Sequence, residues 1–302
     1  MNKIVICIPT FKRPEMLKKL VLSIIECNID ESLISSRSIV IVDNDAGMSA
    51  EATVAGIIEN EAKGVEINYS GFPAKGLANV RNELMRIGLA QNPQFIVFVD
   101  DDEYVVADWL NELVKTIESN NGDMAMGPID SIVGKDIPPY ISCWLQRENY
   151  LNNTRQYFIR TGNLIIRVAS LLEKNVWFDP RFNKTGGEDS FFGLQMIKKG
   201  AKIFWASKAV VCEAVPDDRA NLKWLSARYY NGANKFTFIL KLERNRLKMA
   251  RKIAVSLIYI VAGFFGLILI FFPITKRYMG LLKLSEGLGG IAGFLSLRYN
   301  EY

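Results

Sequence analysis

The fold of this chain follows from one stretch of its sequence, Gln94-Phe95-Ile96-Val97-Phe98-Val99-Asp100-Asp101-Asp102-Glu103. Five consecutive apolar residues, rich in β-branched and aromatic types, predict a strand that is buried on both faces. Four carboxylates follow, and they repel one another and lose solvation unless a positive charge compensates them. A divalent cation is one such charge, because hard cations prefer oxygen ligands. The alternative is a solvated acidic turn, so the stretch alone leaves both readings open.

Strands and helices alternate around this stretch in the first part of the chain. The predicted strands are residues 4–8, 38–42, 65–69 and 95–99, and the predicted helices are residues 14–27, 49–62, 76–88 and 107–119. This alternation predicts βαβ units and a largely parallel sheet. Strands 4–8, 38–42 and 95–99 end in polar residues, so their carboxyl ends are expected to line one ligand-binding edge. Later elements are predicted at residues 164–167, 189–199, 203–205 and 210–212.

The composition excludes several kinds of chemistry. The chain has 302 residues, a net charge of +5 and no histidine. Hydrolysis by a Ser–His–Asp triad and His-ligated catalytic zinc are therefore excluded, and acid–base chemistry near neutral pH falls mainly to carboxylates. The four cysteines are widely spaced and predict buried thiols in a reducing compartment: Cys7, Cys27, Cys143 and Cys212.

The C-terminal part has the composition of a membrane segment. Residues 253–274 carry no charge over 22 positions, which is long enough to cross a hydrocarbon core. Residues 278–297 are rich in glycine but include Lys283 and Glu286, so a second span and an interfacial helix both stay open. Basic residues cluster just before the first run, which indicates an anionic membrane surface rather than nucleic acid and places the large domain in the cytoplasm.

A Gly-Gly-Glu-Asp block precedes the helix predicted at residues 189–199. An acidic residue in a first helical turn is favoured by the helix dipole, so Asp189 is explained by capping alone. Two preceding glycines, Gly186 and Gly187, also indicate a backbone arranged to aim a carboxylate at a ligand. The local sequence leaves both explanations open.

Six motifs in a fixed order carry a family resemblance. They are Pro9-Thr10-Phe11-Lys12-Arg13-Pro14, Val42-Asp43-Asn44, Gly76-Leu77-Ala78-Asn79-Val80-Arg81-Asn82, Asp100-Asp101-Asp102, Gly187-Glu188-Asp189 and Glu213-Ala214-Val215-Pro216. No single motif is decisive, but the ordered set resembles inverting family 2 glycosyltransferases with the GT-A fold. The nearest branch is the succinoglycan-type bacterial polysaccharide glucosyltransferases. The resemblance covers residues 4–236.

The resemblance implies an α/β fold of the GT-A nucleotide-sugar-binding type, with a mainly parallel central sheet and C-terminal membrane-associated helices. It makes residues 1–216 the catalytic domain and residues 217–252 amphipathic basic juxtamembrane helices. Residues 253–302 become the membrane segment, with one span at 253–274 and a second span or interfacial helix at 278–297. The expected location is the bacterial inner membrane, with the catalytic domain on the cytoplasmic face.

The resemblance also implies the site residues. The nucleotide-binding set is Pro9, Thr10, Phe11, Arg13, Asp43, Arg81, Asp100 and Asp101. Within it, Asp43 is expected to pair with the base and Asp100 to lie near the ribose. Asp102 is expected to bind Mg²⁺ or Mn²⁺, and Asp189 to act as the catalytic base with Glu188 beside it in the acceptor region.

Several of these residues have plainer alternatives. Asp101 and Glu103 could serve only to shape the turn after the strand. Arg81 and Lys75 are candidates for contact with the diphosphate, with solvent-facing helix charges as the alternative. Glu213 stands near a position where some family members carry a histidine metal ligand, and a salt bridge with Arg219 is the alternative there. Trp144 is a candidate for stacking on a sugar, although large apolar side chains are more often buried.

The implied activity is inverting transfer of a hexose, such as glucose from a UDP-sugar, onto a polyprenyl-diphosphate-linked oligosaccharide in bacterial surface or exopolysaccharide synthesis. The implied partners are a nucleotide-diphosphate sugar, the lipid-linked glycan and the membrane, with no nucleic acid. One alternative is an inactive membrane-anchored scaffold, yet the four carboxylates of the motifs are all present. The other is a metal-dependent nucleotidyltransferase, which normally needs a glycine-rich loop after the first strand, and residues 9–14 contain no glycine.

Overall fold

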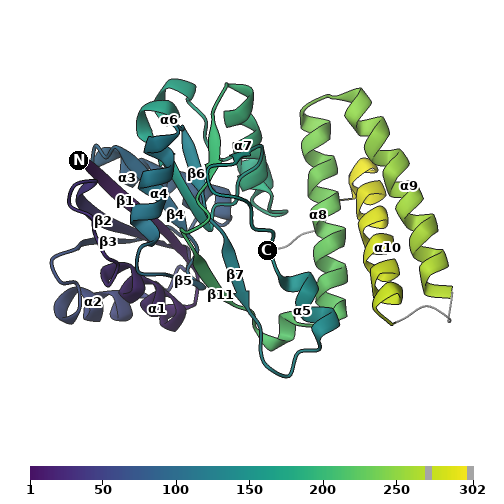
Figure 1. Cartoon of the computed structure of the whole chain (residues 1–302), viewed down its shortest axis with the longest axis horizontal. Helices are drawn as coiled ribbons and strands as arrows, with labels where there is room; N and C mark the ends of the chain where they lie inside the picture. The colour runs from purple at the N-terminus through teal and green to yellow at the C-terminus, as the bar shows by residue number, and fades with distance from the viewer. Residues whose placement is uncertain (269–273, 298–302) are drawn as a thin grey trace. The chain divides into compact units, whose positions relative to one another are not determined.

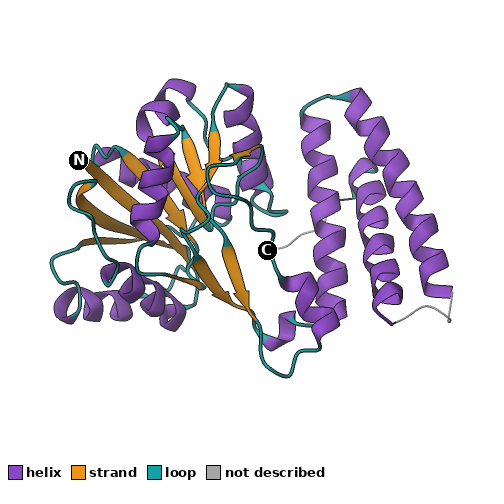
Figure 2. Ribbon diagram, viewed as in Figure 1, coloured by secondary structure: helices purple, strands orange, loops and turns teal. Residues whose placement is uncertain are grey.

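A computed structural model describes residues 1–268 and 274–297 of the chain. The chain divides into two compact units. The larger unit consists of residues 1–132, 147–183 and 188–214, and the smaller unit of residues 133–146, 184–187 and 215–302. The predicted domain boundary at residue 216 lies beside the last of these divisions, but two short internal segments group with the C-terminal part. Figure 1 shows the course of the chain, and Figure 2 shows its helices and strands.

The larger unit holds all eleven strands of the described residues. Its elements are β1 (Asn2–Thr10), α1 (Pro14–Ile25), β2 (Ile34–Asp43), α2 (Glu51–Asn60), β3 (Glu66–Gly71), α3 (Leu77–Ala90), β4 (Phe95–Val99), β5 (Glu103–Val105), α4 (Trp109–Ser119), β6 (Met124–Met126), β7 (Ile129–Ile132), β8 (Arg155–Gln156), β9 (Asn163–Arg167), α6 (Val168–Lys174), η1 (Pro180–Phe182), α7 (Glu188–Lys198), β10 (Ile203–Trp205) and β11 (Val211–Ala214).

The central sheet has the strand order β3-β2-β1-β4-β9-β6-β10-β8. The β3–β2, β2–β1, β1–β4 and β6–β10 pairs are parallel, which confirms the predicted mainly parallel α/β sheet. β9 runs antiparallel to both β4 and β6, and β8 runs antiparallel to β10. A second sheet has the order β5-β11-β7. Because β1, β2 and β4 are parallel neighbours, the polar residues that follow them meet at one edge.

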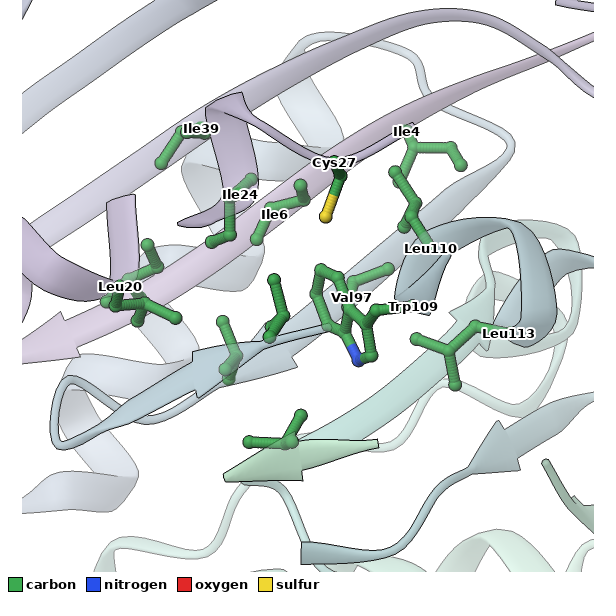
Figure 3. Close-up of a cluster of buried hydrophobic side chains, with 14 of the residues drawn as sticks. Ile4, Ile6, Leu20, Ile24, Cys27, Ile39, Val97, Trp109, Leu110 and Leu113 are labelled. Carbon is green, nitrogen blue, oxygen red and sulfur yellow. The ribbon is translucent and has the colours of Figure 1, made fainter. Parts of the chain in front are cut away.

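β4, the strand predicted at residues 95–99, is buried on both faces, as predicted. All five residues of β4 are buried. Phe95, Val97 and Val99 point into one core cluster and Ile96 and Phe98 into the other. The first cluster also contains apolar residues of α1 and α4, several of which Figure 3 shows around Val97. Continuous apolar runs are typical of strands covered by helices on both sides.

Several elements differ from the sequence predictions. β1 and β2 continue through the polar residues Thr10 and Asp43, because parallel pairing holds these residues in register with each other. β5 and β6 were not predicted, because β5 begins inside the acidic run and β6 contains no β-branched or aromatic residue. Cys7 and Cys27 are buried as predicted, but Cys143 is exposed, so the prediction of four buried thiols is wrong for that residue.

The smaller unit is helical in the described residues. It contains α5 (Pro139–Leu145), η2 (Asp217–Arg219), α8 (Leu222–Leu242), α9 (Arg246–Ile268) and α10 (Ile274–Phe294). The segment 217–252, predicted as juxtamembrane helices, forms α8 and the first turns of α9. Among the described residues, one helix is long and apolar enough to cross a membrane: Arg246–Leu267, with 22 residues. Residues 269–273 and 298–302 of the predicted membrane segment lie outside the described residues.

Candidate active site

The turn after β1 is held by the carboxylate of Asp101. Its Oδ2 accepts hydrogen bonds from the Thr10 hydroxyl at 2.8 Å and the Phe11 backbone N–H at 3.3 Å. Its Oδ1 accepts from Arg13 Nη1 at 3.1 Å. The residue is buried, with 6% of its surface exposed. These contacts support the turn-shaping alternative for Asp101, while the Phe11 ring is half exposed at the same turn.

Burial alters the protonation of Asp101. Desolvation raises the pKa of this carboxyl from 3.8 to about 6, although Arg13 and Thr10 act in the opposite direction. Because the folded protein holds the proton more tightly than the unfolded chain, the stability from this group is fully present below about pH 4. It is lost as the pH rises through about 6, which corresponds to about 3 kcal/mol in the free energy of unfolding.

We expect the Asp101→Asn variant to lack this part of the pH dependence, because its side chain does not titrate. Thermal unfolding midpoints of both proteins in detergent, measured between about pH 4 and pH 7, report the difference. The midpoint of the parent should fall relative to that of the variant across this range. Two parallel curves would contradict the assignment of a raised pKa to Asp101.

The end of β2 carries Asp43, whose side chain is completely buried. Its Oδ1 accepts from the backbone N–H of Asp45 at 2.9 Å. Its Oδ2 accepts from the Ala50 N–H at 3.0 Å and from the Tyr69 hydroxyl at 2.8 Å. Asp43 thus fixes the loop between β2 and α2. Its pairing with a nucleotide base stays a prediction, and the structure adds this loop-holding role.

A buried arginine joins the two acidic motifs. Arg81 lies on α3 with 3% of its surface exposed. Its Nη2 donates to Asp100 Oδ1 at 3.0 Å, after β4, and its Nη1 donates to Glu188 Oε1, at the start of α7. Burial lowers the pKa of Arg81, but the carboxylates of Asp100, Glu188 and Asp189 outweigh burial and raise it. The alternative of a solvent-facing helix charge is therefore wrong for Arg81, whereas Lys75 is exposed.

Asp189 lies in the first turn of α7 and is partly exposed. Its Oδ1 accepts from the Ser190 backbone N–H at 2.6 Å and from the Ser190 hydroxyl at 3.2 Å. No residue in the described parts of the chain donates to Oδ2. The N-terminal turn of a helix stabilises a carboxylate in its charged form. The arrangement holds one oxygen in place and leaves the other available as a proton acceptor.

The carboxylate of Asp102 has the chemistry of a hard-cation ligand. Its Oδ2 accepts from Arg13 Nη1 at 2.9 Å, and 19% of its side chain is exposed. Within residues 1–268 and 274–297, three or more Asp, Glu, Cys or His side chains do not gather into a metal-binding group. Mg²⁺ is commonly held by one or two carboxylates together with substrate phosphates. Asp102 therefore fits a site that the diphosphate of a donor would complete.

Three further charged residues lie around this site without having been predicted to act there: Glu103, Arg147 and Arg160. Glu103 is buried and accepts from the Asp100 backbone N–H at 3.0 Å, and burial raises its pKa well above the usual range. Opposite it on β11, Glu213 pairs with Arg147. Arg160 lies over the Phe158 ring at 5.2 Å, and burial lowers its pKa. The acidic run already contained Glu103, but the two arginines carry no local sequence signal.

The surroundings of Gly162 and Trp144 complete the description of the site and of the remaining candidates. A Cβ atom on Gly162, the residue before β9, would lie 2.5 Å from Glu103 Oε1, so the Glu103 side chain packs closely on this glycine. Trp144 lies in the smaller unit, where it packs edge-on against Tyr229 with ring centroids 6.2 Å apart. A role of Trp144 in sugar stacking, and a role of Glu213 at a metal, both stay predictions.

Two family models and one protein of known process match this chain. The family described as "Glycosyl transferase family 2" matches residues 5–171, and "Glycosyl transferase family group 2" matches residues 95–294. The chain is 29% identical to the succinoglycan biosynthesis protein ExoM of Rhizobium meliloti (strain 1021), over 97% of this chain and 93% of that protein.

Similar solved structures include S. aureus TarS 1–349, with a TM-score of 0.56 and 15% identity, over 98% of this chain and 92% of that one. The same protein in complex with UDP gives a TM-score of 0.55, at 15% identity and the same coverage. Its complex with UDP-GlcNAc also gives 0.55, at 14% identity, over 98% of this chain and 93% of that one. At these identities the likeness shows a shared fold.

Proposed function

This chain belongs to glycosyl transferase family 2, and we propose that it transfers a hexose, with inversion, from a UDP-sugar to a polyprenyl-diphosphate-linked glycan. The observation that carries the proposal is the buried Arg81, which bridges Asp100 in one acidic motif and Glu188 in the other. This bridge holds the end of β4, where a nucleotide sugar is expected to bind, beside the start of α7, where Asp189 lies. Similarity to a succinoglycan biosynthesis protein supports bacterial surface or exopolysaccharide synthesis as the process.

Asp189 is the proposed catalytic base. An acceptor hydroxyl has a high pKa, so a carboxylate within hydrogen-bond reach must take its proton as the hydroxyl attacks. The Ser190 N–H holds Oδ1 of Asp189, which leaves Oδ2 to receive the proton. A single base on the face opposite the leaving group gives one displacement and therefore inversion. Glu188 has a different role from Asp189, because its pairing with Arg81 makes it a positioning residue for the start of α7.

The turn at residues 9–13 and Asp100 are the proposed contacts of the nucleotide. Asp101 holds the turn through Thr10 and the Phe11 N–H, so the exposed Phe11 ring is placed at the ends of β1 and β4. Asp100 is one-third exposed on the side chain, and Arg81 fixes one of its oxygens. Both features keep the edge of the sheet rigid before a ligand binds, which reduces the entropy lost on binding.

Asp102 would hold Mg²⁺ or Mn²⁺. When bound, such an ion neutralises charge that develops on the leaving diphosphate. Arg13 now shares the Asp102 carboxylate and keeps it turned toward the ends of β1 and β4. We expect EDTA to abolish transfer and Mn²⁺ or Mg²⁺ to restore it, and we expect Asp102→Asn to need more metal for half-maximal activity. Full activity in EDTA would contradict the metal site.

A panel of UDP-, GDP- and dTDP-sugars tests the donor. Incubation with Mn²⁺, followed by thermal unfolding and by assay of slow donor hydrolysis, should single out a UDP-hexose as the compound that both stabilises the protein and is hydrolysed. Stabilisation by RT ln(1 + [L]/Kd) means that a ligand at 100 times its Kd adds about 2.7 kcal/mol. No response to any nucleotide sugar would contradict the proposal, and NMR of the product's anomeric proton tests inversion.

The smaller unit supports action at a membrane. Its helix Arg246–Leu267 is apolar and only 11% of its most apolar stretch is buried. We propose the cytoplasmic face of the bacterial inner membrane as the location, because basic residues cluster in the first turns of this helix and just before it. A lipid-linked acceptor follows from that location. Equal transfer to a water-soluble acceptor by a chain lacking the smaller unit's last two helices would contradict this part of the proposal.

A further inference from the structure

The apolar helix of the smaller unit is exposed along one face only. The outward side chains of α9 are exposed by between 38% and 62%: Leu257, Ile258, Val261, Phe264, Phe265 and Leu267. Its opposite face carries polar groups. Ser256 is buried, Tyr259 lies 5.9 Å from Lys283 Nζ, and Lys252 Nζ is 3.5 Å from Glu286 Oε1. The few polar groups of α9 thus lie against α10, and its outward face is apolar.

Glycines fix how far α10 lies along α9. A Cβ on Gly287 would meet the Ser256 backbone oxygen at 2.6 Å, and a Cβ on Gly263 would meet the Gly280 oxygen at 2.7 Å. These close contacts place the stretch of α9 from Ser256 to Gly263 directly beside the part of α10 that runs from Gly280 to Gly287. The two helices are antiparallel neighbours in Figure 1.

Glycines fix the position of α8 in the same way. A Cβ on Gly289 would meet the Tyr230 oxygen at 2.1 Å, and a Cβ on Gly293 would meet the Asn234 oxygen at 2.8 Å. Leu225 also packs in one cluster with Leu282. The first half of α8, before Tyr230, therefore lies level with the apolar stretch of α9. All three helices would share the same range of depth if α9 stood across a membrane.

Charged residues lie on the parts of α8 and α10 that are level with the apolar stretch of α9. Lys223 and Arg228 are exposed on the first half of α8, and Lys283 and Glu286 lie on the matching part of α10. If α9 crossed a bilayer at right angles, these four groups would enter the hydrocarbon with it. A Lys, Arg or Asp at the centre of a spanning helix opposes membrane insertion, because the charged group loses its hydration. The arrangement of the three helices therefore disfavours a crossing.

We propose that α9 lies in the plane of the membrane and that its outward face enters an anionic phospholipid surface to the depth of the acyl boundary. The inference rests on the membrane location proposed above and replaces the span expected from the sequence. Exposed cations in the first turns of α9, at Arg246, Lys248 and Arg251, match anionic headgroups at the same depth. α8 and the charged part of α10 then stay on the water side. The unit binds one leaflet without crossing the membrane.

Cysteine labelling of the full-length protein tests this orientation. Arg244→Cys and Met279→Cys mark the two ends of the α9–α10 pair, because Arg244 lies just before α9 and Met279 adjoins Gly280, which packs on Gly266. Both residues are exposed, and Cys143→Ser removes the exposed native thiol. Sealed vesicles of both orientations are treated with a membrane-impermeant maleimide. Ser36→Cys, on the larger unit, marks the side of the catalytic part.

The expected result is that Arg244→Cys and Met279→Cys are labelled from the same side as Ser36→Cys. Labelling of Met279→Cys only from the other side, or only after detergent is added, overturns the in-plane orientation. Fractionation separates this outcome from failure of the proposed function. Recovery of the parent protein entirely in the soluble fraction would overturn the membrane location itself. Membrane recovery with labels on opposite sides would overturn only the orientation of α9.

Discussion

The Asp189→Asn variant is expected to lose sugar transfer by about 10²–10⁴-fold while it still binds the nucleotide sugar. Asparagine has the same shape as aspartate and can keep the hydrogen bond from the Ser190 N–H, but its amide has no basic oxygen to accept the acceptor's proton. The loss should therefore fall on kcat, because the substitution removes a proton transfer that occurs in the transition state. Donor binding should stay close to that of the parent.

Radioactive or mass-spectrometric assay of product measures the rate, and thermal stabilisation by the donor measures binding. Asp130→Asn is the matched control, because it makes the same chemical change at an exposed carboxylate of the larger unit. It should keep the parent's activity. If Asp189→Asn retained more than about a tenth of the parent's turnover, Asp189 would not be the base.

The second large effect is expected for Arg81→Met. Methionine fills much of the space of the arginine but leaves Glu188 and Asp100 without their cation. Removing one partner of a buried ion pair costs about 3–5 kcal/mol, because the remaining charge stays uncompensated. We expect the free energy of unfolding to fall by that amount and transfer to be lost with it, since Arg81 positions the start of α7. Thermal unfolding in detergent and the transfer assay measure the two effects.

Arg86→Met provides the control for Arg81. Arg86 lies on the same helix, but it is exposed and pairs with Glu83 three residues before it. Exposed pairs of this kind contribute little to stability, so this variant should unfold and react as the parent does. In the double variant Arg81→Met, Glu188→Gln, the uncompensated charge of Glu188 is gone, and part of the stability should return without activity. Equal stability of Arg81→Met and Arg86→Met would rule out the bridge.

The two substitutions separate two kinds of role at one site. Asp189 is proposed to take part in the reaction, so Asp189→Asn should change the rate and leave stability unchanged. Arg81 acts through the residues that it holds, so Arg81→Met should change both. Asp101 adds a third pattern, because its variant is expected to change the pH dependence of stability. These readouts differ enough to test each assignment independently.

Much of the larger unit was predictable because its signals are local. The apolar run 95–99 and the carboxylates after it correctly predicted β4 and the placement of acidic residues at a sheet edge. Periodic apolar positions correctly predicted α1 and α3 to within a few residues. Hydrophobic periodicity depends only on neighbours along the chain, so it can be read directly from the sequence. The reversed strand β9 has no such signal, since direction within a sheet depends on the path of the chain.

The order of the acidic motifs, the absence of histidine chemistry and an apolar C-terminal segment can all be read directly from the sequence. Which charges meet depends on the packed fold. Arg81 pairs with Glu188, and Asp101 with the turn at Thr10, across separations in the chain at which no local pattern exists. Likewise, composition predicted that α9 is long enough to span a membrane. Its packing through glycines set which charged residues lie beside its apolar stretch, because burial and pairing are properties of the packed helices and not of one segment.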